Sequence, residues 1–130
     1  MSRKSKGISA ERELLHSFWG SGWACVRVAG SGSMCFPSPD LLAGNGPRKL
    51  AIECKAINDD KKYFSQDDVD KIVEFSRKFG AEAWFGVKFL GIGWFFISLD
   101  DLDKTKGNFV VSLALAKNKG LSFDELIGKF

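Results

Sequence analysis

The chain has 130 residues, a formal net charge of +3 and a hydrophobic fraction of 45%. This length suits one domain with a real core, so we expect residues 1–130 to fold as a single unit. No apolar run is long enough to cross a bilayer, and no signal-peptide segment follows the basic N-terminus, so we expect a cytoplasmic protein without a membrane partner. Three cysteines and one histidine do not form a zinc-binding pattern and favour reduced thiols.

Hydrophobic periodicity and turn residues predict an ordered set of helices and strands. We expect a helix over 9–19, strands over 23–29, 40–43 and 49–56, a helix over 66–79, strands over 83–89 and 93–97, a short strand over 109–111, and a short final helix at the capping box of Ser122 and Glu125. Ser65 with Asp68 and the later Gly80 are typical helix boundaries. The order α-β-β-β-α-β-β indicates an α/β layered domain with a mixed sheet.

An acidic residue occupies an unusual place in the first predicted helix. Glu11 lies on the same stripe as Leu15 and Phe18, which we expect to face the core. An unpaired buried charge is costly, so Glu11 needs a cation or another partner.

Two carboxylates and a lysine occupy neighbouring predicted strands. Asp40 follows Pro39 at the start of one strand, and the next strand places Glu53 and Lys55 on the same face. Adjacent strands lie roughly 4.8 Å apart, so both carboxylates can share one ion. Oxygen ligands of this kind suit Mg²⁺, with Mn²⁺ as a substitute, and Lys55 can stabilise charge that develops on a phosphate. This combination predicts metal-dependent hydrolysis of a phosphodiester.

A simpler interpretation is that Glu53 and Lys55 form an exposed ion pair, since such triplets are frequent by chance. Basic pairs such as Lys61 and Lys62 are likewise compatible with an ordinary solvated surface. The presence of Asp40 and of the inward-facing Glu11 favours a metal site over an isolated ion pair, because one bound ion explains all these acidic residues together.

The Pro39-Asp40 and Glu53-x-Lys55 pair resembles the PD-(D/E)xK nuclease superfamily. The wider pattern resembles the archaeal Holliday junction resolvases, in about the first hundred residues and in the correct order: Gly7, Ala10-Glu11-Arg12-Glu13, Val26-Arg27, Ala29-Gly30-Ser31, Pro39-Asp40, Glu53-x-Lys55, Glu74-Phe75 and Val87-Lys88. The resemblance implies a restriction-endonuclease-like fold, with a central mixed sheet of about five strands flanked by helices.

The same resemblance implies roles for individual residues. The matching positions are Glu11, Asp40 and Glu53 for metal binding, Lys55 and Ser31 for catalysis together with these acids, and Arg12, Arg27, Ser31 and Ser33 for DNA contacts. It also implies a homodimer that nicks opposed strands of a four-way DNA junction symmetrically, with no small-molecule substrate. One departure is Met34-Cys35-Phe36, which is apolar where relatives often carry basic residues.

Phe75 and Phe79 lie one helical turn apart in the second predicted helix. Such a pair usually belongs to the core. Val69, Ile72 and Val73 already provide a packing stripe, however, and the resemblance favours a dimer contact for the two phenylalanines.

Two other functions remain open at this point. A restriction-type or repair nuclease acting on ordinary duplex DNA would use the same acids and lysine. A DNA-binding module without catalysis is disfavoured, because clustered carboxylates repel phosphates and contribute nothing to binding.

Overall fold

A mixed sheet forms the centre of the molecule. The computed structural model describes residues 3–28 and 35–128. In this part of the chain, five strands run in the order β1 (Ala24–Arg27), β2 (Leu41–Gly44), β3 (Lys49–Ile57), β5 (Glu82–Phe89) and β6 (Gly93–Ser98). β3 and β5 are parallel, and the other neighbours in this sheet are antiparallel. The expected central mixed sheet is therefore confirmed.

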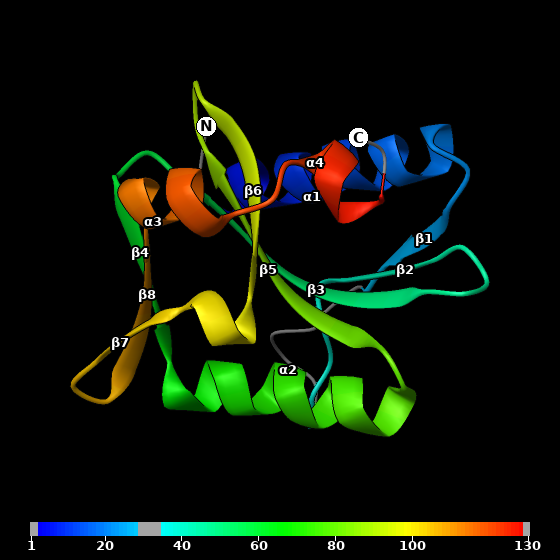
Figure 1. The fold of residues 1–130 in the computed structure, drawn as a ribbon. Helices are drawn as coiled ribbons and strands as arrows, with labels where there is room; N and C mark the ends of the chain where they lie inside the picture. Colours follow the sequence, from blue (N-terminus) through cyan, green and yellow to red (C-terminus); the bar gives the residue numbers. More distant parts are fainter. Residues whose placement is uncertain (1–2, 29–34, 129–130) are drawn as a thin grey trace.

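Helices cover both faces of this sheet, with α1 above it and α2 below it in Figure 1. α1 (Arg3–Gly20) buries Phe18 in a cluster that includes Ile52 of β3. α2 (Gln66–Phe79) buries Ile72 in a second cluster that includes Phe85 of β5. The expected α/β layering follows from these two apolar contacts.

The boundaries of α2 agree with the sequence. Ser65 accepts a hydrogen bond from the backbone N–H of Asp68, and the Asp68 carboxylate accepts one from the backbone N–H of Ser65. Gly80 ends the helix in a left-handed conformation with φ of 84°, which favours glycine. α1, by contrast, begins at Arg3 rather than at Ser9. The residues before Ile8 lack the apolar spacing that marks a helix, so the sequence did not predict this extension.

A second, three-stranded sheet was not predicted. It contains β4 (Lys61–Ser65), β8 (Asn108–Ser112) and β7 (Asp103–Thr105) in that order, and η2 (Leu99–Asp101), α3 (Leu113–Lys119) and α4 (Phe123–Leu126) complete the elements. β4 buries only Phe64 fully, and β7 is exposed along its length. Strands with so few apolar residues do not show the alternation of apolar and polar residues that predicts a strand, so β4 and β7 were not expected. Of the elements in this paragraph, the sequence predicted only part of β8 and the final helix.

The central sheet divides at one point. β1 and β2 pair only as far as Arg27 and Leu41, whereas β3 continues beside β5 to Ile57. Within the described residues, the last part of β3 therefore has no strand paired with it on the side of β2.

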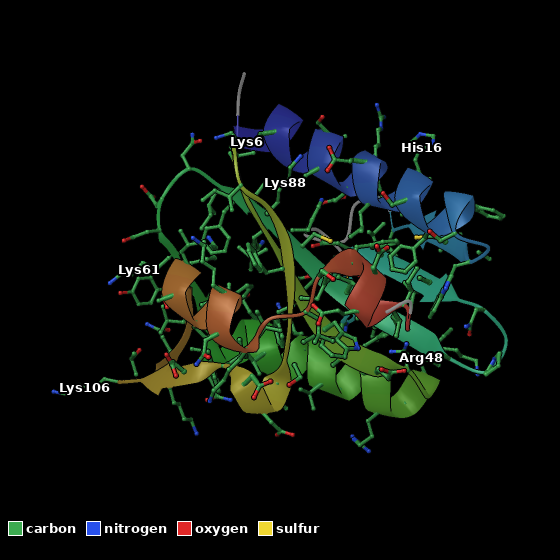
Figure 2. All side chains as sticks on the ribbon, turned by 45° about the horizontal axis from the view of Figure 1, so that its top comes forward. Lys6, His16, Arg48, Lys61, Lys88 and Lys106 are labelled. Atoms are coloured by element: carbon green, nitrogen blue, oxygen red, sulfur yellow. The ribbon has the colours of Figure 1, made fainter. Side chains whose placement is uncertain are left out.

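Phe18→Ala should destabilise the fold, because Phe18 is fully buried where α1 packs on the sheet. Removing a buried phenylalanine side chain costs about 3–5 kcal/mol. The free energy of unfolding from urea titration measures this loss. His16→Ala is the matched control on the same helix, because His16 is exposed and points outward in Figure 2. Equal stabilities of the two variants would contradict this packing.

Candidate active site

A cleft of about 830 Å³ opens where β1 ends and β2 begins. Its walls come from the first turns of α1, the ends of β1 and β3, and β4. The charged side chains that line it are Lys6, Glu11, Arg27, Asp40, Lys55, Asp59, Lys61 and Lys62. The cleft therefore combines acids with an excess of cations along one surface.

Asp40 lies just before β2 and contacts β3 directly. Its backbone N–H donates to the carbonyl of Ile52 at 3.1 Å, and its Oδ2 accepts from the backbone N–H of Cys54 at 2.8 Å. Its carboxyl also forms a side-chain hydrogen bond with Glu53. The register in which Leu41 pairs with Ile52 thus brings the two predicted acids together.

The Glu53 carboxyl sits in an environment that disfavours its charge. Burial is the main cause and the neighbouring Asp40 charge is the next, and together they raise the pKa of Glu53 to about 8 despite the opposing charge of Lys55. Asp68 of α2 adds a smaller repulsion. At neutral pH the Glu53 carboxyl therefore retains its proton beside Asp40.

Glu11 faces inward, as expected, and its partner is Arg27. Arg27 Nε lies 2.8 Å from Glu11 Oε1, and the Glu11 side chain is only 17% exposed. Burial raises the pKa of Glu11, and the nearby Asp40 charge adds to this effect, whereas Arg27 and Lys55 oppose it. Glu11, Asp40 and Lys55 are thus close enough to influence one another.

The donor set fits a divalent cation at two of the three predicted acids. Across residues 3–28 and 35–128, no three acidic, histidine or cysteine side chains form a ready ligand cluster. Asp40 and Glu53 are in contact, while the carboxylate of Glu11 is held by Arg27. A hard cation can replace the proton between two carboxyls. Binding of this cation by Glu11 stays a prediction.

The other predicted DNA-binding residues have mixed positions. Arg27 lines the cleft, whereas Arg12 is exposed on α1 and is not among the described residues that line it. Ser31 and Ser33 lie outside the described residues. Their predicted roles in the loop therefore remain predictions.

Some cleft residues were missed by sequence reasoning. Lys6 lies in the unexpected first turns of α1, and Lys61, Lys62 and Tyr63 belong to β4, which was not predicted. The adjacent lysines were visible as a basic pair, but a basic pair alone does not indicate which surface it faces.

Glu13 connects α1 to the strands β5 and β6 of the central sheet. Lys88 Nζ lies 2.9 Å from Glu13 Oε2, and Trp94 Nε1 donates to Glu13 Oε1 at 3.0 Å. The hydrogen bond from Lys88 is the main cause that lowers the pKa of Glu13. These contacts tie the helix that carries Glu11 to β5 and β6.

The predicted interface residues border an apolar groove of about 390 Å³. Phe75 and Phe79 stack with ring centroids 5.2 Å apart, and Phe36 and Pro37 join them around the groove. Phe79 is 51% exposed and Phe36 is 78% exposed. Phe79 therefore does not extend the buried stripe of α2.

Comparisons with known proteins agree on one family. A family model described as archaeal Holliday junction resolvase (Hjc) matches residues 2–130. The crossover junction endodeoxyribonuclease Hjc of Archaeoglobus fulgidus is 43% identical over 127 residues, covering 98% of this chain and 93% of that relative. The Methanocaldococcus jannaschii protein of the same name is 34% identical and covers 95% of this chain and 88% of its own length.

A solved structure gives the same result. The structure of Archaeoglobus fulgidus Hjc, a Holliday junction resolvase from an archaeal hyperthermophile, superimposes with a TM-score of 0.87 at 41% identity. The match covers 92% of this chain and 97% of that chain. Within the described residues, none of the helices combines the length and apolar character that a bilayer crossing requires.

Raising the pH should destabilise the metal-free protein while Glu53 titrates. The unfolded chain ionises Glu53 near its ordinary pKa of 4.5, whereas the folded chain retains the proton up to about 8. Between these values the folded state binds more protons, so the free energy of unfolding falls as pH rises. We expect Tm in EDTA to fall from pH 5 to pH 8.5, by roughly 3–5 °C for each kcal/mol lost.

Two variants isolate this effect. Glu53→Gln cannot ionise and should reduce the pH dependence of Tm. Asp70→Asn, which changes an exposed carboxyl on α2, should retain it. A Glu53→Gln protein with the wild-type pH dependence would contradict the raised pKa of Glu53.

Proposed function

The chain belongs to the archaeal Holliday junction resolvase family, and we propose that it is a crossover junction endonuclease that cuts four-way DNA with a divalent metal ion. The observation that carries this function is the contact between Asp40 and Glu53 beside Lys55, at the wall of a cleft rich in cations. The names of the relatives supply the substrate class, and the cleft supplies the surface on which a DNA strand can lie.

Asp40 and Glu53 would hold the metal ion, with Glu11 beside them. Such an ion, when bound, lowers the pKa of water and polarises a phosphodiester. Mg²⁺ is the proposed ion and Mn²⁺ its substitute, because the donors are carboxylate oxygens. This ligand set explains why three acids lie near a surface that otherwise suits phosphates.

Cationic side chains would act on the phosphate itself. Lys55 lies close enough to Glu53 and Glu11 to favour their charged forms, and it can orient water or stabilise charge that develops on the phosphate. Arg27 also lines the cleft, and its guanidinium can bind a phosphate through two N–H donors. Arg12, Ser31 and Ser33 are proposed DNA contacts on the strength of their matching positions in the family.

We also propose a homodimer formed through the apolar groove. Phe75 and Phe79 stack on the surface of α2, and the exposed Phe36 extends the same apolar face. The apolar Phe36 in the loop, a departure from the family pattern, fits an interface better than a phosphate contact. A two-fold dimer would present two equal sites to a two-fold symmetric junction and would nick opposed strands.

The organisation and location of the chain complete the proposal. The family model spans residues 2–130, which supports a single nuclease domain over the whole chain. The family is archaeal, and in cells without a nucleus the DNA lies in the cytoplasm, so we place the protein there.

Asp40→Asn and Glu53→Gln should each reduce junction cleavage, because each removes an anionic ligand from the metal site. Loss of one such group in an active site costs roughly 10²–10³-fold in rate. Binding of the junction in EDTA should persist, since less negative charge faces the phosphates. Single-turnover cleavage of a labelled four-way junction, with and without Mg²⁺, measures the rate.

Asp103→Asn is the matched control, because Asp103 is an exposed acid on β7 outside the cleft. Wild-type rates in the Asp40 and Glu53 variants would exclude this site. A parallel assay with linear duplex of equal length separates a junction resolvase from a nuclease of ordinary duplex, because only the former prefers the junction.

Phe75→Ala combined with Phe79→Ala should weaken the dimer. Loss of a central aromatic contact costs about 2 kcal/mol or more, which corresponds to at least a roughly 30-fold higher dissociation constant. Sedimentation at several concentrations measures the change. Ile92→Ala removes another exposed apolar side chain and should leave the dimer intact. An unchanged dimer in the double phenylalanine variant would reject this interface.

A further inference from the structure

The cleft has a second wall that the proposed catalysis does not use. We call it the distal wall and define it as Lys6 of α1 together with Lys61, Lys62 and Tyr63 of β4. Figure 2 shows Lys6 at the start of α1 and Lys61 on the side of β4. These side chains come from segments far apart in the sequence, yet they line the same cleft as Asp40 and Lys55.

The lysines of the distal wall are not neutralised by neighbouring acids. Lys71 and Lys88 elsewhere on the surface form ion pairs with carboxylates. Within the described residues, no such pair involves Lys6, Lys61 or Lys62. Asp59 lines the cleft next to this wall, so three lysines line this part of the cleft against one acidic residue.

The wall is held in place by the second sheet. Phe64 is fully buried and packs edge-on against Phe85 of β5 with ring centroids 5.2 Å apart. The carbonyl of Asp60 accepts a hydrogen bond from the backbone N–H of Leu113 at 2.7 Å, which ties the turn before β4 to α3. The strand that carries Lys61 and Lys62 is therefore held in place at the cleft.

We propose that the distal wall binds phosphates of the cleaved strand that lie beyond the scissile phosphate on one side, and so positions the junction arm in the cleft. This inference rests on the proposed function and names a substrate contact of the same site. Lysines without an ion-pair partner and an exposed tyrosine side chain are typical donors to phosphates, and contacts of this kind fix the position of the DNA without reading its sequence. The distal wall would thus help set the distance between the branch point and the cut.

Each phosphate neutralised by a lysine releases counterions, so the salt dependence of binding counts these contacts. The slope of log K against log salt changes by about 0.9 for each phosphate on duplex DNA. Lys61→Ala with Lys62→Ala should therefore reduce the slope for junction binding in EDTA by roughly 2. With Mg²⁺ present, the same variant should raise KM more than it lowers kcat, because the contacts position the arm.

Lys104→Ala with Lys106→Ala is the matched control. It removes the same charge from the same sheet, but these lysines lie in the β7–β8 hairpin and do not line the cleft. Figure 2 shows Lys106 pointing outward from that hairpin. The slope of this control should equal that of the wild type. Equal slopes for both double variants would overturn the proposal.

A second measurement locates the contact. Single methylphosphonate groups, which carry no charge, are placed in turn along the cleaved strand of the junction. The wild type should lose affinity at the scissile phosphate and at phosphates beyond it on one side. The Lys61/Lys62 variant should lose its sensitivity only at the latter positions. Loss of sensitivity at every position alike would overturn the assignment.

These results are distinguishable from a failure of the proposed function. Absence of Mg²⁺-dependent junction cleavage by the wild type would reject the function. The salt slopes and the methylphosphonate pattern are measured in EDTA and compare variants of the same protein, so they test the distal wall without any cleavage.

Discussion

The contact between two carboxyl groups on adjacent strands is the constraint around which the cleft is built. Asp40 and Glu53 meet because the β2–β3 hairpin fixes their register, and Asp40 is held by the backbone of β3. Two neighbouring carboxylates in a partly buried place repel each other and lose hydration, so a proton or a cation must accompany them. Lys55 supplies further compensation beside Glu53, and Arg27 compensates the nearby Glu11. The fold thereby maintains a site that is stable only with added positive charge.

The division of the central sheet turns this pair into an accessible site. Because β1 ends at Arg27 and β2 begins at Leu41, no strand of the described residues pairs with the last residues of β3 on the side of β2. The backbone N–H of Cys54 is satisfied by the Asp40 carboxylate. Asp40 thus contributes both to the contact with β3 and to the lining of the cleft, which also includes residues of β4 from the second sheet.

The proposed catalytic and dimer surfaces belong to different parts of the molecule. The cleft is lined by α1, β3 and β4, whereas the apolar groove is lined by α2 and the segment with Phe36. Apolar contacts and phosphate contacts have opposite requirements for water, so their separation lets each surface keep the composition that it needs. Phe36, the last residue of the apolar Met34-Cys35-Phe36 sequence, borders the apolar groove of this proposed interface.

Local patterns in the sequence determined the central elements and the core of the site. Strand alternation and one short hairpin suffice to bring Asp40, Glu53 and Lys55 together, since these are contacts between close neighbours in the chain. Only the tertiary structure decided that Arg27 pairs with Glu11 and that the basic pair of β4 faces the cleft. β4 and β7 carry too few apolar residues to show a strand period, and they are held by packing on distant elements. Partners that lie far apart in the sequence leave no local pattern, because their meeting depends on how the whole chain packs.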